Sequence, residues 1–371
     1  MKQNLAKRIA RLQAEMLKSR MDAVVFADRE NLIYYADTVE VECMAAVIPA
    51  AGDPILCCLW LDAPYVKARS GADGIRTYKF PSEAVGSAIV GAMKDLGLDN
   101  SVVGFHKYFV DFPVFDAVRN AFPDMRWCSA AEITYRVRSV KDAGEMERIA
   151  DACKYVDIGM GTAVDFLRPG VTEVAVLAEA DHAMRKAGSE GASFRMQVLT
   201  WPKQLLAHPY AGNVVIEDNQ PVVIHLGATC EGYTAKMART VFLGDVPEET
   251  IKIYDILQKV QDRAVVACRP GAKSSEIYEY ACLPVYEAGY SKFFLEHLGY
   301  GVGIRQSEFY PVIGKDIDHA LEKDMVVDLL LPTIYKRGVG GPRLTDMVYV
   351  SEEGGVRMTS FSRDVLRKRY N

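Results

Sequence analysis

The chain has 371 residues, half of them hydrophobic and a quarter charged, with a net charge of −5. This length is enough for two domains with separate cores, and the composition is ordinary for a soluble globular protein. The net negative charge argues against nucleic acid as a partner. No run approaches the roughly 18 consecutive apolar residues of a membrane span, so no membrane association is expected.

The N-terminal segment has no apolar core of signal-peptide length, and the eight cysteines form no C-x-x-C pair. Both features favour a cytoplasmic location, with most of the cysteines present as buried free thiols.

Strand and helix patterns alternate over the first part of the chain. DAVVFAD is typical of a buried strand, MAAVIPAAGDPILCCLWL predicts a hairpin turning at Gly52–Asp53, and AVGSAIVGAMKDLGL has helical spacing before the strand SVVGFH. This alternation predicts an α/β domain over residues 1–136. The segment RVRSVKDAGEMERI then opens a long helix, which begins a second domain over residues 137–371.

The second domain contains an internal repeat. An Arg-Pro-Gly sequence begins at Arg168 and again at Arg269, a hundred and one positions later. Each copy follows an amphipathic helix and precedes another helix with Thr or Ser near its start, and apolar strands follow. We therefore expect an α+β domain in which two helix–helix–strand units, related by a pseudo-twofold axis, leave a cleft between them.

Three stretches in the last third carry a family resemblance: PVVIHLGATCEGYTAKMARTVFLG, LGYGVGIRQSE and MVVDLLLPTIYKRGVGGPRLTDMVYV. They resemble motifs of the pita-bread superfamily, which contains methionine aminopeptidases, Xaa-Pro peptidases and creatinase. In metal-dependent members these motifs supply five ligands. The same five places here hold His225, Lys236, Tyr300, Leu331 and Thr345. Since none is the carboxylate that hard divalent cations need, we expect no metal and no other cofactor.

The resemblance also suggests which residues carry chemistry. His208, in LLAHPYAG, matches a family histidine that touches substrate and that serves as the acid/base in creatinase. Imidazole titrates near neutral pH, which suits proton transfer. His225, Lys236 and Tyr300 are expected to face the volume that metals occupy in relatives and to bind or polarise the reacting group. The alternatives are a core histidine at 208 and a structural Lys236 paired with Asp346 or Glu308.

Further residues have assigned roles on the same basis. Trp201, Tyr210 and Glu308 are candidate substrate contacts, and Arg239, Arg343 and Asp346 are expected to support the strands through ion pairs. The acidic loop ADTVEVECM resembles one by which a partner subunit closes the pocket in two-domain relatives, so Glu40 and Glu42 are candidate substrate contacts in a homodimer. A solvated acidic loop is the alternative.

These expectations predict a metal-independent, creatinase-like enzyme with His208 as acid/base. It would cleave a C–N or similar bond of a small polar or zwitterionic substrate by hydrolysis or elimination. One alternative is a non-catalytic member of the fold that binds a peptide or protein. Another is an Xaa-Pro aminopeptidase or dipeptidase with an atypical metal site.

Overall fold

A computed structural model describes residues 2–106, 112–192, 194–206 and 209–370. The chain divides into two compact units, Met1–Arg138 and Ser139–Asn371. Within the described ranges, no helix combines the length and the apolar character needed to cross a membrane.

The N-terminal unit is an α/β domain built on one six-stranded sheet in the order β4-β3-β2-β1-β5-β6. The strands are β1 (Ala23–Phe26), β2 (Ala45–Pro49), β3 (Ile55–Leu59), β4 (Gly74–Tyr78), β5 (Val102–Phe105) and β6 (Arg126–Ser129). The helices are α1 (Gln3–Lys18), α2 (Arg29–Ala36), α3 (Ala63–Ser70), α4 (Val85–Asp95), α5 (Phe112–Ala121) and α6 (Ala131–Ser139). The predicted hairpin is confirmed: β2 and β3 pair antiparallel, and Gly52 takes a φ of +95°, which favours glycine.

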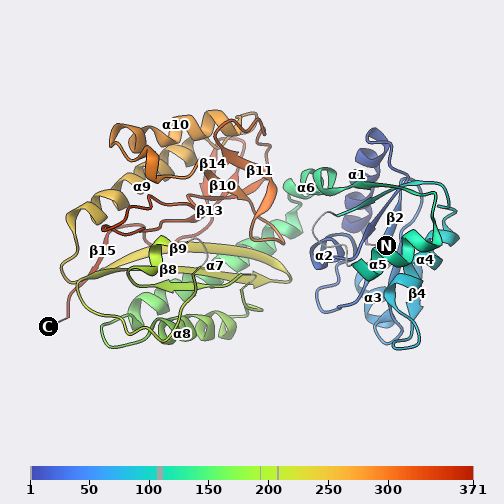
Figure 1. Ribbon diagram of the computed structural model, residues 1–371, viewed down its shortest axis with the longest axis horizontal. Helices are drawn as coiled ribbons and strands as arrows, with labels where there is room; N and C mark the ends of the chain where they lie inside the picture. Colours follow the sequence, from blue (N-terminus) through green and yellow to red (C-terminus); the bar gives the residue numbers. More distant parts are fainter. Residues whose placement is uncertain (1, 107–111, 193, 207–208, 371) are drawn as a thin grey trace. The chain divides into compact units, whose positions relative to one another are not determined.

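The C-terminal unit contains two sheets and two pairs of helices (Figure 1). The helices are α7 (Ala143–Phe166), α8 (Glu173–Lys186), α9 (Glu248–Ala267) and α10 (Ser274–Glu287). A four-stranded sheet, in the order β15-β9-β8-β7, contains β7 (Gln197–Leu199), β8 (Gln220–Cys230), β9 (Tyr233–Leu243) and β15 (Leu366–Lys368). A five-stranded sheet, in the order β11-β10-β12-β13-β14, contains β10 (His297–Gly301), β11 (Glu308–Gly314), β12 (Val326–Leu329), β13 (Asp346–Val350) and β14 (Gly355–Arg357).

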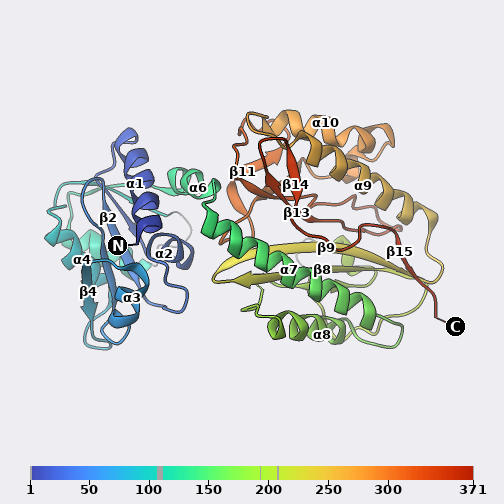
Figure 2. The same ribbon diagram turned by 180° about the vertical axis from the view of Figure 1, so that it is seen from behind.

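The predicted repeat is present in the fold. Both Arg-Pro-Gly sequences end a long helix, α7 or α9, and their glycines, Gly170 and Gly271, have φ values of +89° and +83°. Thr172 caps α8 by accepting a hydrogen bond from the backbone N–H of Ala175, at 3.2 Å. The second copy differs because Lys273 occupies the cap position without a side-chain hydrogen bond. Helices α7 and α8 lie on one side of the strands and α9 and α10 on the other (Figure 2), which confirms the duplicated α+β architecture.

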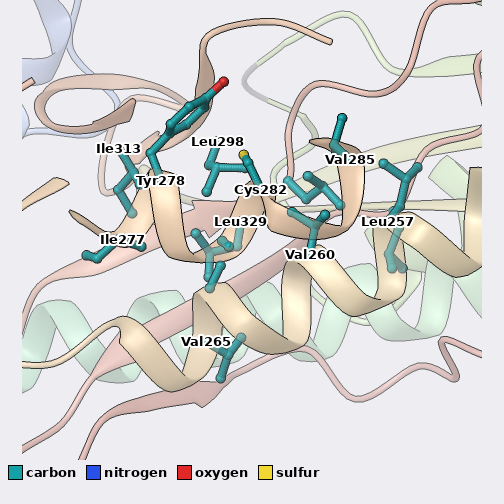
Figure 3. Packing of buried hydrophobic residues seen from close by; sticks show 14 of the residues in the cluster. Leu257, Val260, Val265, Ile277, Tyr278, Cys282, Val285, Leu298, Ile313 and Leu329 are labelled. Carbon is teal, nitrogen blue, oxygen red and sulfur yellow. The ribbon is translucent and has the colours of Figure 1, made fainter. Parts of the chain in front are cut away.

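The core between α9, α10 and the five-stranded sheet holds the second half together (Figure 3). Its buried side chains include Leu257, Val260 and Val265 of α9, Ile277, Tyr278, Cys282 and Val285 of α10, and Leu298, Ile313 and Leu329 of the strands. Burying a side chain of this kind stabilises the fold by about 1.5–3 kcal/mol. This packing fixes β10 and β12, which carry two polar groups of the site described below.

Candidate functional site

One row of side chains crosses both sheets of the C-terminal unit. Gln197 of β7 pairs with His225 of β8, His225 pairs with Ala238 of β9, and Ala238 forms an isolated bridge to Thr345, just before β13. Directly opposed residues of antiparallel strands project from the same face. The row therefore joins two of the five expected places, His225 and Thr345, and connects the two halves of the repeat.

Lys236 lies beside this row, and each N–H donor of its ammonium group has an acceptor. It pairs with Gly227 of β8, two positions from His225 along the strand. Its side chain is 2% exposed and forms an ion pair with the fully buried carboxylate of Asp328. Its ammonium group also donates to the backbone oxygen of Gln306 at 2.6 Å and to the Ser307 hydroxyl at 3.2 Å. Three acceptors match the three N–H donors of an ammonium group.

The ion pair corrects one expectation and reveals a residue that sequence reasoning missed. Lys236 was expected, under its structural alternative, to pair with Asp346 or Glu308, and that choice of partner is wrong. Asp328 is the partner, and its other oxygen accepts a hydrogen bond from the backbone N–H of Tyr300 at 2.5 Å. A signal was available, because a carboxylate inside the apolar run MVVDLLL must find a partner when buried.

Tyr300 is brought near Lys236 through this shared carboxylate. The Tyr300 side chain is half-buried, and its pKa is raised, first by burial and then by the charge of Asp328. Tyr300 is therefore a neutral hydrogen-bond donor at neutral pH.

Leu331, which stands at another of the five places, is half-buried, and its backbone N–H donates to the Leu298 oxygen at 3.1 Å.

His225 is a buried and neutral imidazole. Its pKa is held well below the ordinary histidine value, chiefly by burial and then by the positive charges of Arg343 and Lys236. The Phe194 ring packs against it with centroids 4.8 Å apart. Its Nε2 atom is buried and has no hydrogen-bond partner among the described residues. One polar atom of the site is thus unused.

The two motif arginines have different surroundings. Arg239 is fully buried and donates to the Asp346 carboxylate at 2.7 Å. Arg343 is 5% exposed and donates instead to the Gln197 side-chain oxygen at 2.5 Å and to the Leu206 backbone oxygen at 3.4 Å. Over the described ranges, Arg343 forms no ion pair with a carboxylate, so the expected support through an ion pair is wrong for this residue.

A cavity of about 580 Å³ is lined in part by Leu206, whose backbone oxygen accepts a hydrogen bond from Arg343; Arg343 itself is not among its lining residues. Its lining includes Trp201 and Leu206, both exposed, and the half-buried Tyr335. Tyr210 is also exposed, but it stacks on the Arg195 guanidinium with 4.8 Å between that group and the ring centroid. Of the two aromatic candidates, Trp201 is the one that lines this cavity.

His208 lies outside the described residues. Both sides of its segment are held by one buried carboxylate, that of Glu173 at the start of α8. Glu173 accepts hydrogen bonds from the Thr200 backbone N–H at 2.9 Å and the Thr200 hydroxyl at 2.7 Å, and from the Gly212 N–H at 3.1 Å. It also forms an ion pair with Lys203. Sequence reasoning missed this anchor.

The remaining acidic candidates lie in different settings. Glu308 is buried at the start of β11 and accepts a hydrogen bond from the Arg305 backbone N–H at 3.4 Å. Glu40 and Glu42 are exposed in the loop between α2 and β2. Asp37, the first acidic residue of the same loop, is buried and forms an ion pair with Arg69 at 3.1 Å.

The donor set of the site suits an anion better than a cation. In the parts of the chain that the structure describes, no group of three or more His, Cys, Asp or Glu side chains is placed to hold a metal ion. The carboxylates that do occur at the site, Asp328 and Asp346, are each occupied by a basic residue.

An α/β unit followed by a duplicated α+β unit, with the site on the row between the two sheets, defines a two-domain protein of the pita-bread class. The chain belongs to metallopeptidase family M24, whose model matches residues 147–352, and the creatinase/prolidase N-terminal domain matches residues 8–140.

Named relatives match between 62% and 97% of the chain. It is 26% identical to the putative dipeptidase YkvY of Bacillus subtilis, over 97% of this chain and 99% of that protein. It is 32% identical to the Xaa-Pro dipeptidase of Pyrococcus furiosus over 230 residues, which are 62% of this chain and 66% of the relative. The structure of an Xaa-Pro dipeptidase from Bacillus anthracis superposes with a TM-score of 0.90 at 23% identity, over 98% of this chain and all of the other.

Proposed function

We propose that the C-terminal unit is a metal-independent enzyme site that cleaves a C–N or similar bond of a small polar or zwitterionic molecule, by hydrolysis or elimination. One observation carries this proposal: the buried ion pair of Lys236 and Asp328. Lys236 occupies a place where the resemblance leads us to expect a metal-binding aspartate, and its charge is already balanced from β12. By that resemblance, the ion pair takes a position that a metal would need.

The charges around this ion pair oppose a divalent cation. Lys236 and Asp328 neutralise one another, His225 is neutral, and Arg343 leaves one positive charge. A dication placed among these groups would gain no shared carboxylate and would be repelled by the guanidinium, and both effects are strong at a buried site.

The roles of the residues follow from their contacts. Lys236 fixes β9 against β12 and the Gln306–Ser307 segment, so its ammonium group acts as a positioning group. Tyr300 offers a hydrogen-bond donor to a reacting oxygen, and the buried His225 keeps one ring nitrogen, without a partner among the described residues, free to bind the reacting group. His208, by resemblance, supplies the proton transfer, and Glu173 anchors both ends of its segment. The acidic residues Glu40 and Glu42 of a partner chain remain candidates for binding a positively charged part of the substrate.

The second candidate function is an Xaa-Pro dipeptidase that uses metal, and the names of the relatives favour it. Both the B. subtilis and the P. furiosus proteins are named as dipeptidases. This candidate needs ligands that differ from those at the five places discussed above. A non-catalytic protein that binds peptides is the third candidate.

Steady-state assays separate these candidates. The substrates would be Xaa-Pro dipeptides, amino acid amides, and guanidino and betaine-like acids, each tested with EDTA and with Mn²⁺. We expect turnover that EDTA leaves unchanged, reduced about 10²–10⁴-fold in His208→Ala, which is the usual contribution of general acid–base catalysis. His182→Ala, on the exposed face of α8, is the matched control and should retain activity.

Dipeptide cleavage that requires Mn²⁺ would establish the second candidate. Full activity in His208→Ala would remove the acid/base assignment.

A further inference from the structure

The cavity of about 580 Å³ in the C-terminal unit is lined by two loops. The loop after β7 supplies Trp201, Lys203 and Leu206, and the loop between β12 and β13 supplies Tyr335 and Arg337. Trp201 is 39% exposed and Leu206 is 55% exposed. Apolar side chains gathered around a hollow, with a few polar groups among them, are typical of a site for a small molecule.

The charges around this cavity leave one positive charge unbalanced. Lys203 forms an ion pair with the buried carboxylate of Glu173, and Lys336, the neighbour of Arg337, forms one with Glu249. Arg337 is exposed and, in the part of the chain that the structure describes, has no carboxylate partner. The guanidinium at the rim is therefore available to a single negative charge of a bound molecule.

A buried glutamine joins the two loops. Gln204 is fully buried, and its side-chain nitrogen donates to the backbone oxygens of Leu199 at 3.1 Å and Pro221 at 2.6 Å. Its side-chain oxygen accepts from the Gly341 N–H at 3.4 Å. These bonds hold the loops in place before a ligand arrives, so little ordering is needed on binding.

A tight turn places Arg337 at the rim of the cavity. The Val339 N–H donates to the Lys336 oxygen at 3.2 Å, and Gly338, the third residue of this turn, has a φ of +81°. A positive φ at this position is typical of a type II turn and favours glycine. Arg337 is the second residue of the turn, and it lines the cavity together with Gly338.

We infer that this cavity binds a planar aromatic molecule that carries one negative charge. The rings of Trp201 and Tyr335 favour an aromatic ring over a saturated ring of similar size. Arg337 favours an anion over its neutral analogue. The lining residues include none of the row Gln197–His225–Ala238–Thr345, so this inference does not depend on the reaction proposed above.

Trp201 can report on binding directly. Its fluorescence would be followed in the full-length Trp60→Phe/Trp127→Phe variant, in which it is the one remaining tryptophan. The probe is phenylacetate, with phenylacetamide as the neutral analogue and cyclohexylacetate as the saturated one. We expect a saturating change in emission with phenylacetate, and a half-maximal concentration about two- to tenfold higher for each analogue.

A thermodynamic cycle isolates the charge. In Arg337→Gln, phenylacetate and phenylacetamide should bind equally, and Tm should be unchanged because Arg337 is exposed. Arg168→Gln is the matched control: Arg168 is also exposed and lies over the Phe166 ring, but it is outside the cavity. This variant should retain the preference for the anion. Tyr335→Leu should weaken phenylacetate binding more than cyclohexylacetate binding.

Four results would overturn the inference: no saturable change in Trp201 emission, equal binding of phenylacetate and phenylacetamide by the parent variant, a preference for the anion that survives Arg337→Gln, or its loss in Arg168→Gln. Cyclohexylacetate binding as tightly as phenylacetate would refute the aromatic class. A change in Trp201 emission on diluting the protein without probe would show that a second copy fills the cavity instead. Since the assay requires neither turnover nor metal, its outcome is separate from that of the proposed function.

Discussion

The buried ion pair between Lys236 and Asp328 gives the strongest prediction for stability. Lys236→Met leaves the fully buried carboxylate of Asp328 with the Tyr300 backbone N–H as its remaining hydrogen-bond donor among the contacts described. Asp328→Leu leaves a buried ammonium group with two neutral acceptors, Gln306 and Ser307. Removing one partner of a buried ion pair costs about 3–5 kcal/mol. Asp328→Leu should cost about 1–3 kcal/mol more, because the Tyr300 N–H also loses its acceptor.

The double variant shows whether Lys236 and Asp328 stabilise the fold as a coupled ion pair or through two independent contributions to the free energy of unfolding. With both charges removed, Lys236→Met/Asp328→Leu should be destabilised by about 1–3 kcal/mol, the cost of the unsatisfied Tyr300 N–H. It should therefore be more stable than either single variant. Lys323→Met, which breaks an exposed ion pair with Glu352, is the control and should cost no more than about 1 kcal/mol.

Urea denaturation measures these free energies. Trp201 is the one tryptophan of three in the C-terminal unit, so a Trp60→Phe/Trp127→Phe background reports that unit alone. Additive costs in the double variant would refute the coupling between Lys236 and Asp328, and with it the physical basis for a metal-free site.

Two further predictions concern the pH dependence of stability and the assembly of the chain. The pKa of His225 is lower in the folded protein than its ordinary value, so unfolded chains bind more protons as pH falls below that value, and stability is lost. His225→Phe should flatten the fall in unfolding free energy between about pH 7 and pH 5, whereas the exposed His182→Gln should not; identical slopes would contradict the burial argument. Light scattering should give a homodimer of twice the 41.2 kDa chain mass, and a monomer at working concentration would count against a partner loop in the site.

Much of the fold was predictable because its signals are local. The two Arg-Pro-Gly sequences mark helix ends through their glycines, and the strand runs alternate with helical spacing in the N-terminal unit. The hairpin at Gly52 follows from a turn between two apolar runs. The structure confirms the helix ends at the two glycines and the hairpin. Most cysteines are buried and all eight are free thiols, although Cys43 is exposed in the loop before β2.

The partners of the site residues were less predictable because they depend on tertiary pairing. Asp328 meets Lys236 only when the five-stranded sheet, which contains β12, and the four-stranded sheet, which contains β9, come together, and the two residues are far apart in sequence. Gln197 lies in a three-residue strand too short to show a pattern. Arg343 and Arg239 have similar motif positions, but only Arg239 meets Asp346, a difference set by the direction of each side chain.

The central claim is that this member of family M24 holds no catalytic metal at its site, and metal analysis tests it most directly. The protein would be purified, incubated with Mn²⁺, Co²⁺, Zn²⁺ or Fe²⁺, dialysed, and analysed by plasma emission spectrometry. We predict far less than one equivalent of metal per chain, both for the wild type and for His225→Phe. About one or two equivalents per chain in the wild type, lost in His225→Phe, would contradict the account and establish a metal-dependent peptidase.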